Sequence, residues 1–198
     1  MSESGGMFVV TDEEARIAVV TLLEFIGEDP TRAGLVETPR RVTAALKEMT
    51  GGYAISDEES LATLFDEQHD EMVVLGGIAF TSLCEHHLLP FTGEAVVGYV
   101  PQNRIVGLSK LARCVYQYAA RLQNQERMTA GIADAVMSVV DPFGVGVVVR
   151  AHHGCMSCRG VRQNGSQMTT SALRGTMRDD AVQRGEFLSL AFGHVGKH

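Results

Sequence analysis

The sequence predicts an α+β fold, in which an antiparallel sheet is backed by two helices and preceded by a helical N-terminal region. Helix start signals and helix-spaced apolar residues occupy the chain up to about residue 65. Short β-rich runs bounded by glycine or proline begin after residue 70, and two helical segments, Leu111–Leu122 and Glu126–Val140, interrupt them. This grouping is typical of α+β domains. We therefore expect an N-terminal helical region at 1–65 and a sheet-containing domain at 66–198.

The first helix is expected to begin at Thr11, after a loose tail formed by residues 1–10. Thr11 and Glu14 have the spacing of a capping box, in which each side chain accepts a hydrogen bond from the other residue's backbone N–H. An apolar stripe at helical spacing follows at Ile17, Val20, Leu23 and Ile26. The two signals together predict a helix.

Two more helices are expected before the sheet. One begins at Thr38-Pro39, because proline is favoured in the first turn of a helix, and it stops at Gly51-Gly52. A short third helix follows Ser56, which has the capping-box spacing to Glu59. These helices complete the N-terminal region.

The strands of the second domain are predicted from β-rich runs and their bounding residues. The expected strands are Met72–Leu75, Ile78–Phe80, Glu94–Val100, Val145–Ala151 and Gln167–Leu173. A closing helix is expected at Asp179–Ala191. The order of the strands in the sheet does not follow from these patterns.

The bulk composition excludes several classes of function. The net charge of the 198 residues is −7, which disfavours nonspecific binding to nucleic acid. An anionic small molecule can still bind where basic residues gather. The apolar runs are too short to cross a bilayer, and the first residues have no signal-peptide pattern. We therefore expect a cytoplasmic protein with no nucleic-acid or membrane partner.

Cysteine and histidine gather in two short segments, each of which follows a strand-like run. Cys84 and His87 are three residues apart, a normal spacing for a first pair of zinc ligands, and Cys155 can supply a third. Three protein ligands leave one tetrahedral position for a water molecule, whose pKa zinc lowers to about 7. His86 and His153 would then lie near the metal as proton carriers.

Other interpretations of the cysteines stay open at this stage. Cys155 and Cys158 have zinc-ribbon spacing, so Cys84, His87, Cys155 and Cys158 can form a closed structural zinc site. Such a site would belong to a noncatalytic, zinc-stapled interaction module. Cys114 lies on an apolar helix and is more simply a packing residue.

Six segments, in order along about residues 12–192, carry a more specific signal. They are Thr38–Val42, Cys84–His87, Gly107–Arg113, Arg121–Arg127, His153–Gly160 and Ser171–Gly175. Together these segments resemble the motifs of the GTP cyclohydrolase I family. The resemblance implies that Cys84, His87 and Cys155 bind Zn²⁺, and that His86 and His153 carry protons during ring opening.

The resemblance also implies which residues hold the substrate, GTP. Gln125 and Glu126 would read the guanine edge, since a carboxylate can accept the paired N–H groups of that edge. Ser109 would hold the base or ribose region. The triphosphate would be held by basic residues, which are Lys110, Arg113, Arg159 and, from a neighbouring subunit, Arg41.

The reaction implied by the resemblance is hydrolysis of GTP at C8, with release of formate and rearrangement to 7,8-dihydroneopterin triphosphate. This is the first step of folate- or pterin-type biosynthesis, and the consuming pathway stays open. The implied fold is the tunnelling fold, whose sheets close into a barrel in a homodecamer with active sites between subunits. A related enzyme that acts on a pterin is an alternative.

Two positions depart from the family pattern. Family members often carry a lysine three residues after the arginine that matches Arg41, and this chain has Ala44 there. Cys158 stands where other members generally have a residue that binds no metal. The first departure concerns the phosphate contact, and the second concerns the open position of the zinc site.

Overall fold

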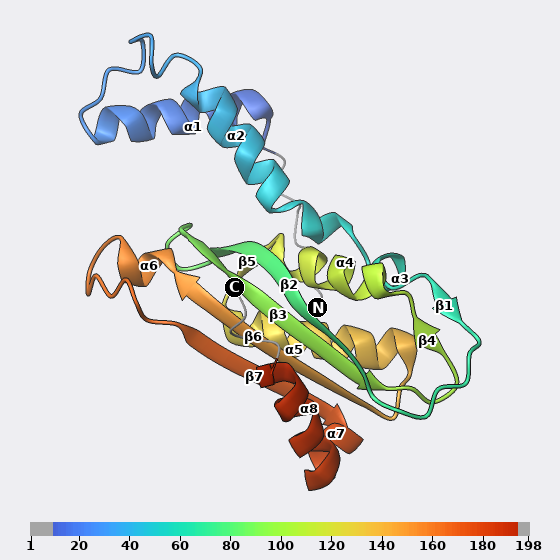
Figure 1. Ribbon diagram of the computed structural model, residues 1–198. Coiled ribbons are helices and arrows are strands. Elements are labelled where there is room, and N and C mark those ends of the chain that lie inside the picture. The colour runs from blue at the N-terminus through green and yellow to red at the C-terminus, as the bar shows by residue number, and fades with distance from the viewer. Residues whose placement is uncertain (1–9, 194–198) are drawn as a thin grey trace, which may run out of the picture. The chain divides into compact units, whose positions relative to one another are not determined.

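A computed structural model describes residues 10–193 of the chain and confirms the α+β class (Figure 1). The tail expected at 1–10 lies outside the described residues, apart from Val10. None of the helices in the described part of the chain has both the length and the apolar character needed to span a membrane.

The described residues form two units that divide between Met49 and Thr50. The helical region expected at 1–65 is longer than the first unit. The residues that follow Thr50 belong with the second unit because they bond to it, as where the Gly52 N–H donates to the Ala120 carbonyl at 2.9 Å. The domain boundary given by the sequence remains a prediction.

The first unit consists of α1 (Asp12–Phe25) and α2 (Thr38–Met49), which pack against each other. The capping box expected at the start of α1 is confirmed. The Glu14 N–H donates to Thr11 Oγ1 at 3.2 Å, and the Thr11 N–H donates to Glu14 Oε2 at 2.8 Å. Helix α2 begins at Thr38, as expected.

The apolar stripe expected on α1 does not form the buried face of the helix. Val19 is the buried residue of α1, whereas Ile17 and Ile26 are 56% and 68% exposed. A unit of two helices covers only part of each helix surface, so much of the stripe is left in contact with solvent.

The second unit is built on a five-stranded sheet with the strand order β5-β2-β3-β6-β7 (Figure 1). Neighbouring strands are antiparallel, except that β5 pairs with β2 in parallel. The strands are β2 (Val73–Cys84), β3 (Pro90–Val100), β5 (Leu122–Gln123), β6 (Gly144–His153) and β7 (Met168–Gly175). A separate two-stranded sheet consists of β1 (Leu64–Phe65) and β4 (Ile105–Val106).

The sheet is backed by two helices on one face, which confirms the expected arrangement. The helices of this unit are η1 (Gly51–Ala54), α3 (Asp57–Ser60), α4 (Leu108–Ala119), α5 (Gln125–Val140), α6 (Gly154–Ser157), α7 (Thr176–Asp179) and α8 (Ala181–Gly193). Alternate residues of β3 point to opposite faces, so Val97 packs in the core beneath α4 and α5, and Val96 packs with Phe187 of α8. The closing helix was expected at Asp179 and begins at Ala181.

Two corrections concern the ends of elements around β2. The runs expected as separate strands at Met72–Leu75 and Ile78–Phe80 are one strand, interrupted by a register shift between Leu75 and Ile78. Gly77 has a φ of +69°, which glycine adopts at no steric cost, and this conformation suits a β-bulge. The helix expected to end at Leu122 ends earlier, because Leu122 pairs with Leu83 in the sheet.

Cys114 is a packing residue, as expected, and we predict that it is chemically inert in the folded protein. Its side chain is buried against α3, α5 and the sheet, and burial raises the pKa of its thiol to about 12. Because the thiolate is the reactive form, almost none is present at pH 8. A thiol reagent should therefore label the native wild-type protein and Cys114→Ala equally, and one fewer labelled thiol in the variant would contradict this.

Candidate metal centre and active site

Three side chains from two distant segments form a cluster suited to a metal ion. Cys84 ends β2, His87 lies in the following turn, and Cys155 lies in α6. Their ligand atoms all lie within 4.8 Å of one another, and Cys84 Sγ is 3.8 Å from His87 Nδ1. Sulfur and nitrogen ligands of a tetrahedral zinc ion are about 3.6 Å apart, given ordinary bond lengths. Two thiols and an imidazole are also the donors that zinc prefers, so the residues fit this ion.

The turn between β2 and β3 places His87 beside Cys84. The Cys84 N–H donates to the Leu89 carbonyl at 2.8 Å, and the Leu88 N–H donates back to the Cys84 carbonyl at 2.9 Å. Leu88 has a φ of +53°, in the left-handed region that non-glycine residues rarely adopt. This tight reversal brings the imidazole back over the thiol.

The pairing of β3 with β6 brings the second segment to the same place. Phe91 is the partner of His153 in the register, so β6 ends beside the start of β3. A Cβ atom added to Gly154 would lie 2.7 Å from the Pro90 carbonyl oxygen, so the absence of a side chain allows this close approach. The short helix that follows then carries Cys155 to the cluster.

Cys158 is not part of the cluster formed by the described residues. Its side chain is exposed, and its Sγ–H donates to the Gly154 carbonyl at 2.8 Å. The closed four-ligand site that the sequence left open is therefore not formed in this structure. By contrast, burial raises the pKa of Cys155, and the neighbouring Cys84 acts in the same direction. A bound cation would favour the thiolates and oppose both effects.

His153 is held by a buried glutamine. Its Nε2 lies 2.8 Å from Gln125 Oε1, and its ring stacks on Phe91 at a centroid distance of 4.7 Å. The Gln125 amide nitrogen faces the acceptors Val149 O, Met168 O and Thr170 Oγ1, each at 3.1 Å. This network orients the amide oxygen toward the ring, so His153 Nε2 carries a hydrogen and the neutral ring leaves Nδ1 as its basic nitrogen. Burial lowers the pKa of His153, opposed by Glu126.

The other expected proton carrier, His86, lies beside the cluster and is open to solvent. Its Nδ1 is 3.8 Å from Cys84 Sγ, and its side chain is 65% exposed. Glu85, between Cys84 and His86, received no role from the sequence. Its contacts with α5 become visible only in the folded chain.

The two residues expected to read guanine have different surroundings. Gln125 is buried, and its amide already bonds to the protein groups described above. Glu126 is exposed and lines a cavity of about 390 Å³ together with β7 residues such as Thr170 and Arg174. The Gln125 amide is therefore already occupied, whereas the exposed Glu126 carboxylate can meet a ligand in this structure.

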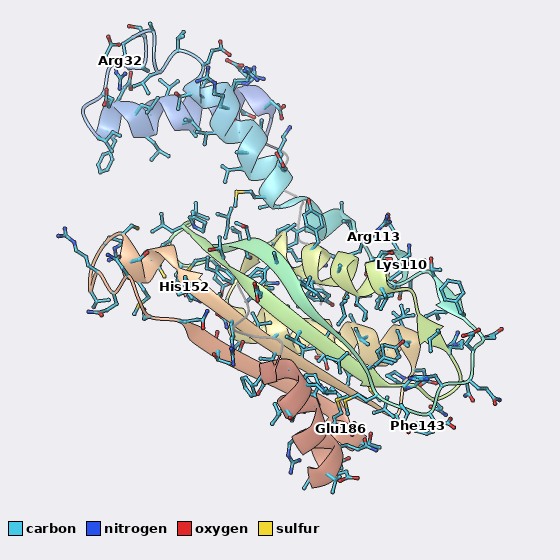
Figure 2. The ribbon with its side chains drawn as sticks, viewed as in Figure 1. Arg32, Lys110, Arg113, Phe143, His152 and Glu186 are labelled. Carbon is cyan, nitrogen blue, oxygen red and sulfur yellow. The ribbon has the colours of Figure 1, made fainter. Side chains whose placement is uncertain are left out.

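The expected phosphate-binding residues are divided between places in the fold. Ser109, Lys110 and Arg113 lie in the first turns of α4, whereas the end of α4 leads through β5 to Cys84. At 1.5 Å per residue, Arg113 lies about 9 Å and Lys110 about 14 Å along the helix axis from the end of α4 at Ala119. Figure 2 shows Lys110 and Arg113 on α4, away from His152 on β6.

The remaining two arginines lie in separate units. Arg159 is exposed after α6, and its Nη1 lies 3.2 Å from His87 Nε2, beside the cluster. Arg41 is exposed on α2 in the first unit. The structure thus places Arg159 beside the metal ligands. Lys110 and Arg113 lie elsewhere in the second unit, on α4.

The contact between Gln125 and His153 gives a testable prediction. Gln125→Leu should lower kcat at least about 10²-fold, because the His153 ring, which is expected to carry protons, loses its orientation. It should also lower the free energy of unfolding by about 1–3 kcal/mol, because buried acceptors lose a donor. Both quantities can be measured by steady-state kinetics and urea unfolding.

A neighbouring residue provides the matched control for this variant. Thr129 Oγ1 donates to the Gln125 carbonyl at 2.6 Å and contacts Thr170 Oγ1 at 2.7 Å, without touching His153. Thr129→Val should therefore lower stability while kcat stays near the wild-type value. Equal kcat values for Gln125→Leu and Thr129→Val would contradict a role for Gln125 in orienting the ring.

Comparison with known proteins is consistent with this geometry. Residues 15–191 match the family model for GTP cyclohydrolase I. The GTP cyclohydrolase 1 of Synechococcus sp. (strain JA-2-3B'a(2-13)) is 54% identical over 189 residues, covering 95% of this chain and 82% of that protein. The corresponding protein of Halalkalibacterium halodurans is 49% identical and covers 94% and 100%, and that of Bacillus subtilis is 48% identical and covers 90% and 95%.

Proposed function

The chain belongs to the GTP cyclohydrolase I family, and we propose that it hydrolyses GTP at C8, releases formate and forms 7,8-dihydroneopterin triphosphate with the help of a zinc ion. Similarity to enzymes over most of the chain sets aside the noncatalytic module and the enzyme acting on a pterin. The observation that carries the proposal is the group formed by Cys84, His87 and Cys155, which has three ligands and no fourth among the described residues.

Each part of the proposed site has a separate chemical task. Zinc held by the three ligands would supply a water molecule with a pKa near 7, which is a nucleophile at neutral pH. Because Gln125 holds Nε2 of His153, Nδ1 is the nitrogen that would first take up a proton, as from the attacking water, and then pass it to the purine as the imidazole ring opens. His86 is exposed and can exchange protons with solvent.

The substrate contacts are proposed from the family motifs and from the position of each residue. The Glu126 carboxylate would accept hydrogen bonds from guanine, and its exposure beside a cavity supports this role. Gln125 would contribute to guanine binding mainly by supporting its neighbours. Ser109 would contact the base or ribose region, and the triphosphate would be bound by Lys110, Arg113, Arg159 and Arg41.

The separation within the second unit supports an active site shared between subunits. Among the described residues, Arg159 bonds to the metal-ligand residue His87, whereas Lys110 and Arg113 lie in the first half of α4, away from His152 of β6 (Figure 2). A second copy would supply them. We therefore propose a homo-oligomer, with the decamer and the barrel of the tunnelling fold as its form, acting in the cytoplasm at the start of a folate- or pterin-type pathway.

A direct assay tests the proposed reaction. Purified protein is loaded with zinc and incubated with GTP, and formate and the fluorescence of the oxidised pterin are then measured. Both products should appear in equal amounts and should disappear after removal of the metal with a chelator. Folded, zinc-loaded protein that forms neither product would contradict the proposal, whereas turnover of a pterin without turnover of GTP would favour the related activity.

A further inference from the structure

Glu85 lies between a metal ligand and a proton carrier, and its carboxylate is bound by the first turn of α5. Asn124 Nδ2 donates to Glu85 Oε1 at 3.1 Å. Arg127 donates to both oxygens, through Nη1 to Oε1 at 3.4 Å and through Nη2 to Oε2. Both carboxylate oxygens are therefore held by side chains of one helix terminus.

The donors that hold Glu85 are themselves fixed. Arg127 Nε donates to Gln123 Oε1 at 3.1 Å, and its Nη2 donates to the Leu122 carbonyl at 3.1 Å. Asn124 caps the helix by accepting the Arg127 N–H through Oδ1 at 2.8 Å. The guanidinium is thus anchored before it meets the carboxylate, so little side-chain freedom is lost in forming the contact.

The backbone reinforces the same connection. The Glu85 N–H donates to the Gln123 carbonyl at 3.0 Å, next to the parallel pair that joins Cys84 to Gln123. The end of β2, the strand β5 and the start of α5 are therefore linked through main chain and side chains at one point.

This link connects the turn that carries the metal ligands with the helix that holds His153. The turn that contains Glu85 carries Cys84, His86 and His87, and the first residue of α5 is Gln125, which holds His153. We propose that Glu85 is a positioning residue, which fixes this turn against α5 so that the metal ligands and His153 keep one relative geometry. The inference rests on the proposed function for its catalytic consequence, although its effect on the metal cluster can be measured without GTP.

A purely stabilising role is a weaker explanation. The side chains of Glu85 and Arg127 are 28% and 54% exposed, and ion pairs so open to solvent contribute little to the free energy of unfolding. The contacts of Glu85 instead join the one turn that carries two metal ligands to β5 and α5. Loss of the carboxylate should therefore change the metal site more than it changes stability.

The test compares Glu85→Gln with a matched control on the same helix. Asp134 lies farther along α5 and pairs with Arg174 Nε at 2.6 Å, so Asp134→Asn removes one acidic partner of α5 without touching the turn. Each protein is loaded with Co²⁺, and the absorption spectrum, the Co²⁺ dissociation constant and the urea midpoint are measured. kcat and KM for GTP are measured on the zinc-loaded proteins.

We expect Glu85→Gln to weaken Co²⁺ binding about tenfold or more, shift the ligand-field bands and lower kcat about tenfold, with a urea midpoint close to that of Asp134→Asn. KM should change less than kcat. Asn124→Ser keeps a capping hydroxyl but loses the amide that donates to Glu85. Its Co²⁺ affinity and kcat should therefore fall, but by less than in Glu85→Gln. This milder variant keeps the test available if Glu85→Gln folds poorly.

A double variant tests whether the pair acts as one unit. The double variant with Glu85→Gln and Arg127→Met should bind Co²⁺ no more weakly, and have a kcat no lower, than either single variant. Both substitutions remove the same link, so their effects should not add. Unchanged Co²⁺ spectra and affinity in Glu85→Gln, or a lower urea midpoint with normal kcat, would overturn the inference. If the wild-type protein does not convert GTP, the proposed function fails, while the Co²⁺ measurements still decide the role of Glu85.

Discussion

Cys155→Ser should lose both bound metal and GTP hydrolysis, with kcat reduced at least about 10³-fold relative to the zinc-loaded wild-type protein. Cys155 is one of three side chains whose ligand atoms lie within 4.8 Å of one another, and no fourth described residue belongs to that group. A serine hydroxyl is a poor ligand for zinc, so two ligands would remain. Metal content per subunit and formate release measure the two effects.

Cys158→Ser is the matched control for this prediction. Cys158 is also a cysteine of the same short segment, but its thiol is exposed and bonds to the Gly154 carbonyl. The variant should keep its metal and its turnover, and its circular dichroism spectrum should match that of Cys155→Ser. Loss of zinc from the Cys158 variant would instead indicate a closed site with four protein ligands, which leaves no position for a reactive water.

The second large effect concerns the proposed sharing of active sites between chains. Lys110→Ala combined with Arg113→Ala should abolish activity by removing the proposed triphosphate contacts, and Cys155→Ser should abolish it by removing a ligand of the proposed zinc ion. Co-expression of the two inactive chains should restore about a quarter of the wild-type activity, because a random mixture pairs an intact metal half with an intact phosphate half in about one site in four. The measurement is formate release by the isolated mixed oligomer.

The complementation experiment has clear controls. Each variant expressed alone should stay inactive, and mass spectrometry of the mixed oligomer should show both chains in one particle. A mixed oligomer without recovered activity would contradict shared sites and would mean that each chain completes its own site. Full activity of the Lys110→Ala and Arg113→Ala chain alone would show that these residues do not bind the substrate.

Local signals in the sequence predicted much of the helical structure. The capping residues Thr11 and Ser56 mark the starts of α1 and α3, since a cap depends on side chains only a few residues apart. The strand β5 was missed because Leu122 continues the helical pattern of α4, and only its pairing with Leu83 makes it a strand. Such pairing depends on distant residues that no local pattern reveals.

In the candidate site, too, local spacing was predicted and contacts between distant residues were not. The spacing of Cys84 and His87 predicted a ligand pair, since both lie in one turn, and the structure places Cys155 beside them. Neither the bond from Gln125 to His153 nor the anchoring of Glu85 by Arg127 was predicted. These contacts join β2, α5 and β6, so they follow from topology rather than from any single segment.

The cluster of Cys84 and Cys155 also has a consequence for handling the protein. Both thiols are free, and their sulfur atoms lie within 4.8 Å of each other, so a small movement would suffice for an oxidant to join them as a cystine bridge. Oxidation by air and binding of the proposed zinc ion would therefore compete for the same two sulfur atoms. Purification under a reductant that does not bind metal is a condition for measuring how much zinc each subunit holds.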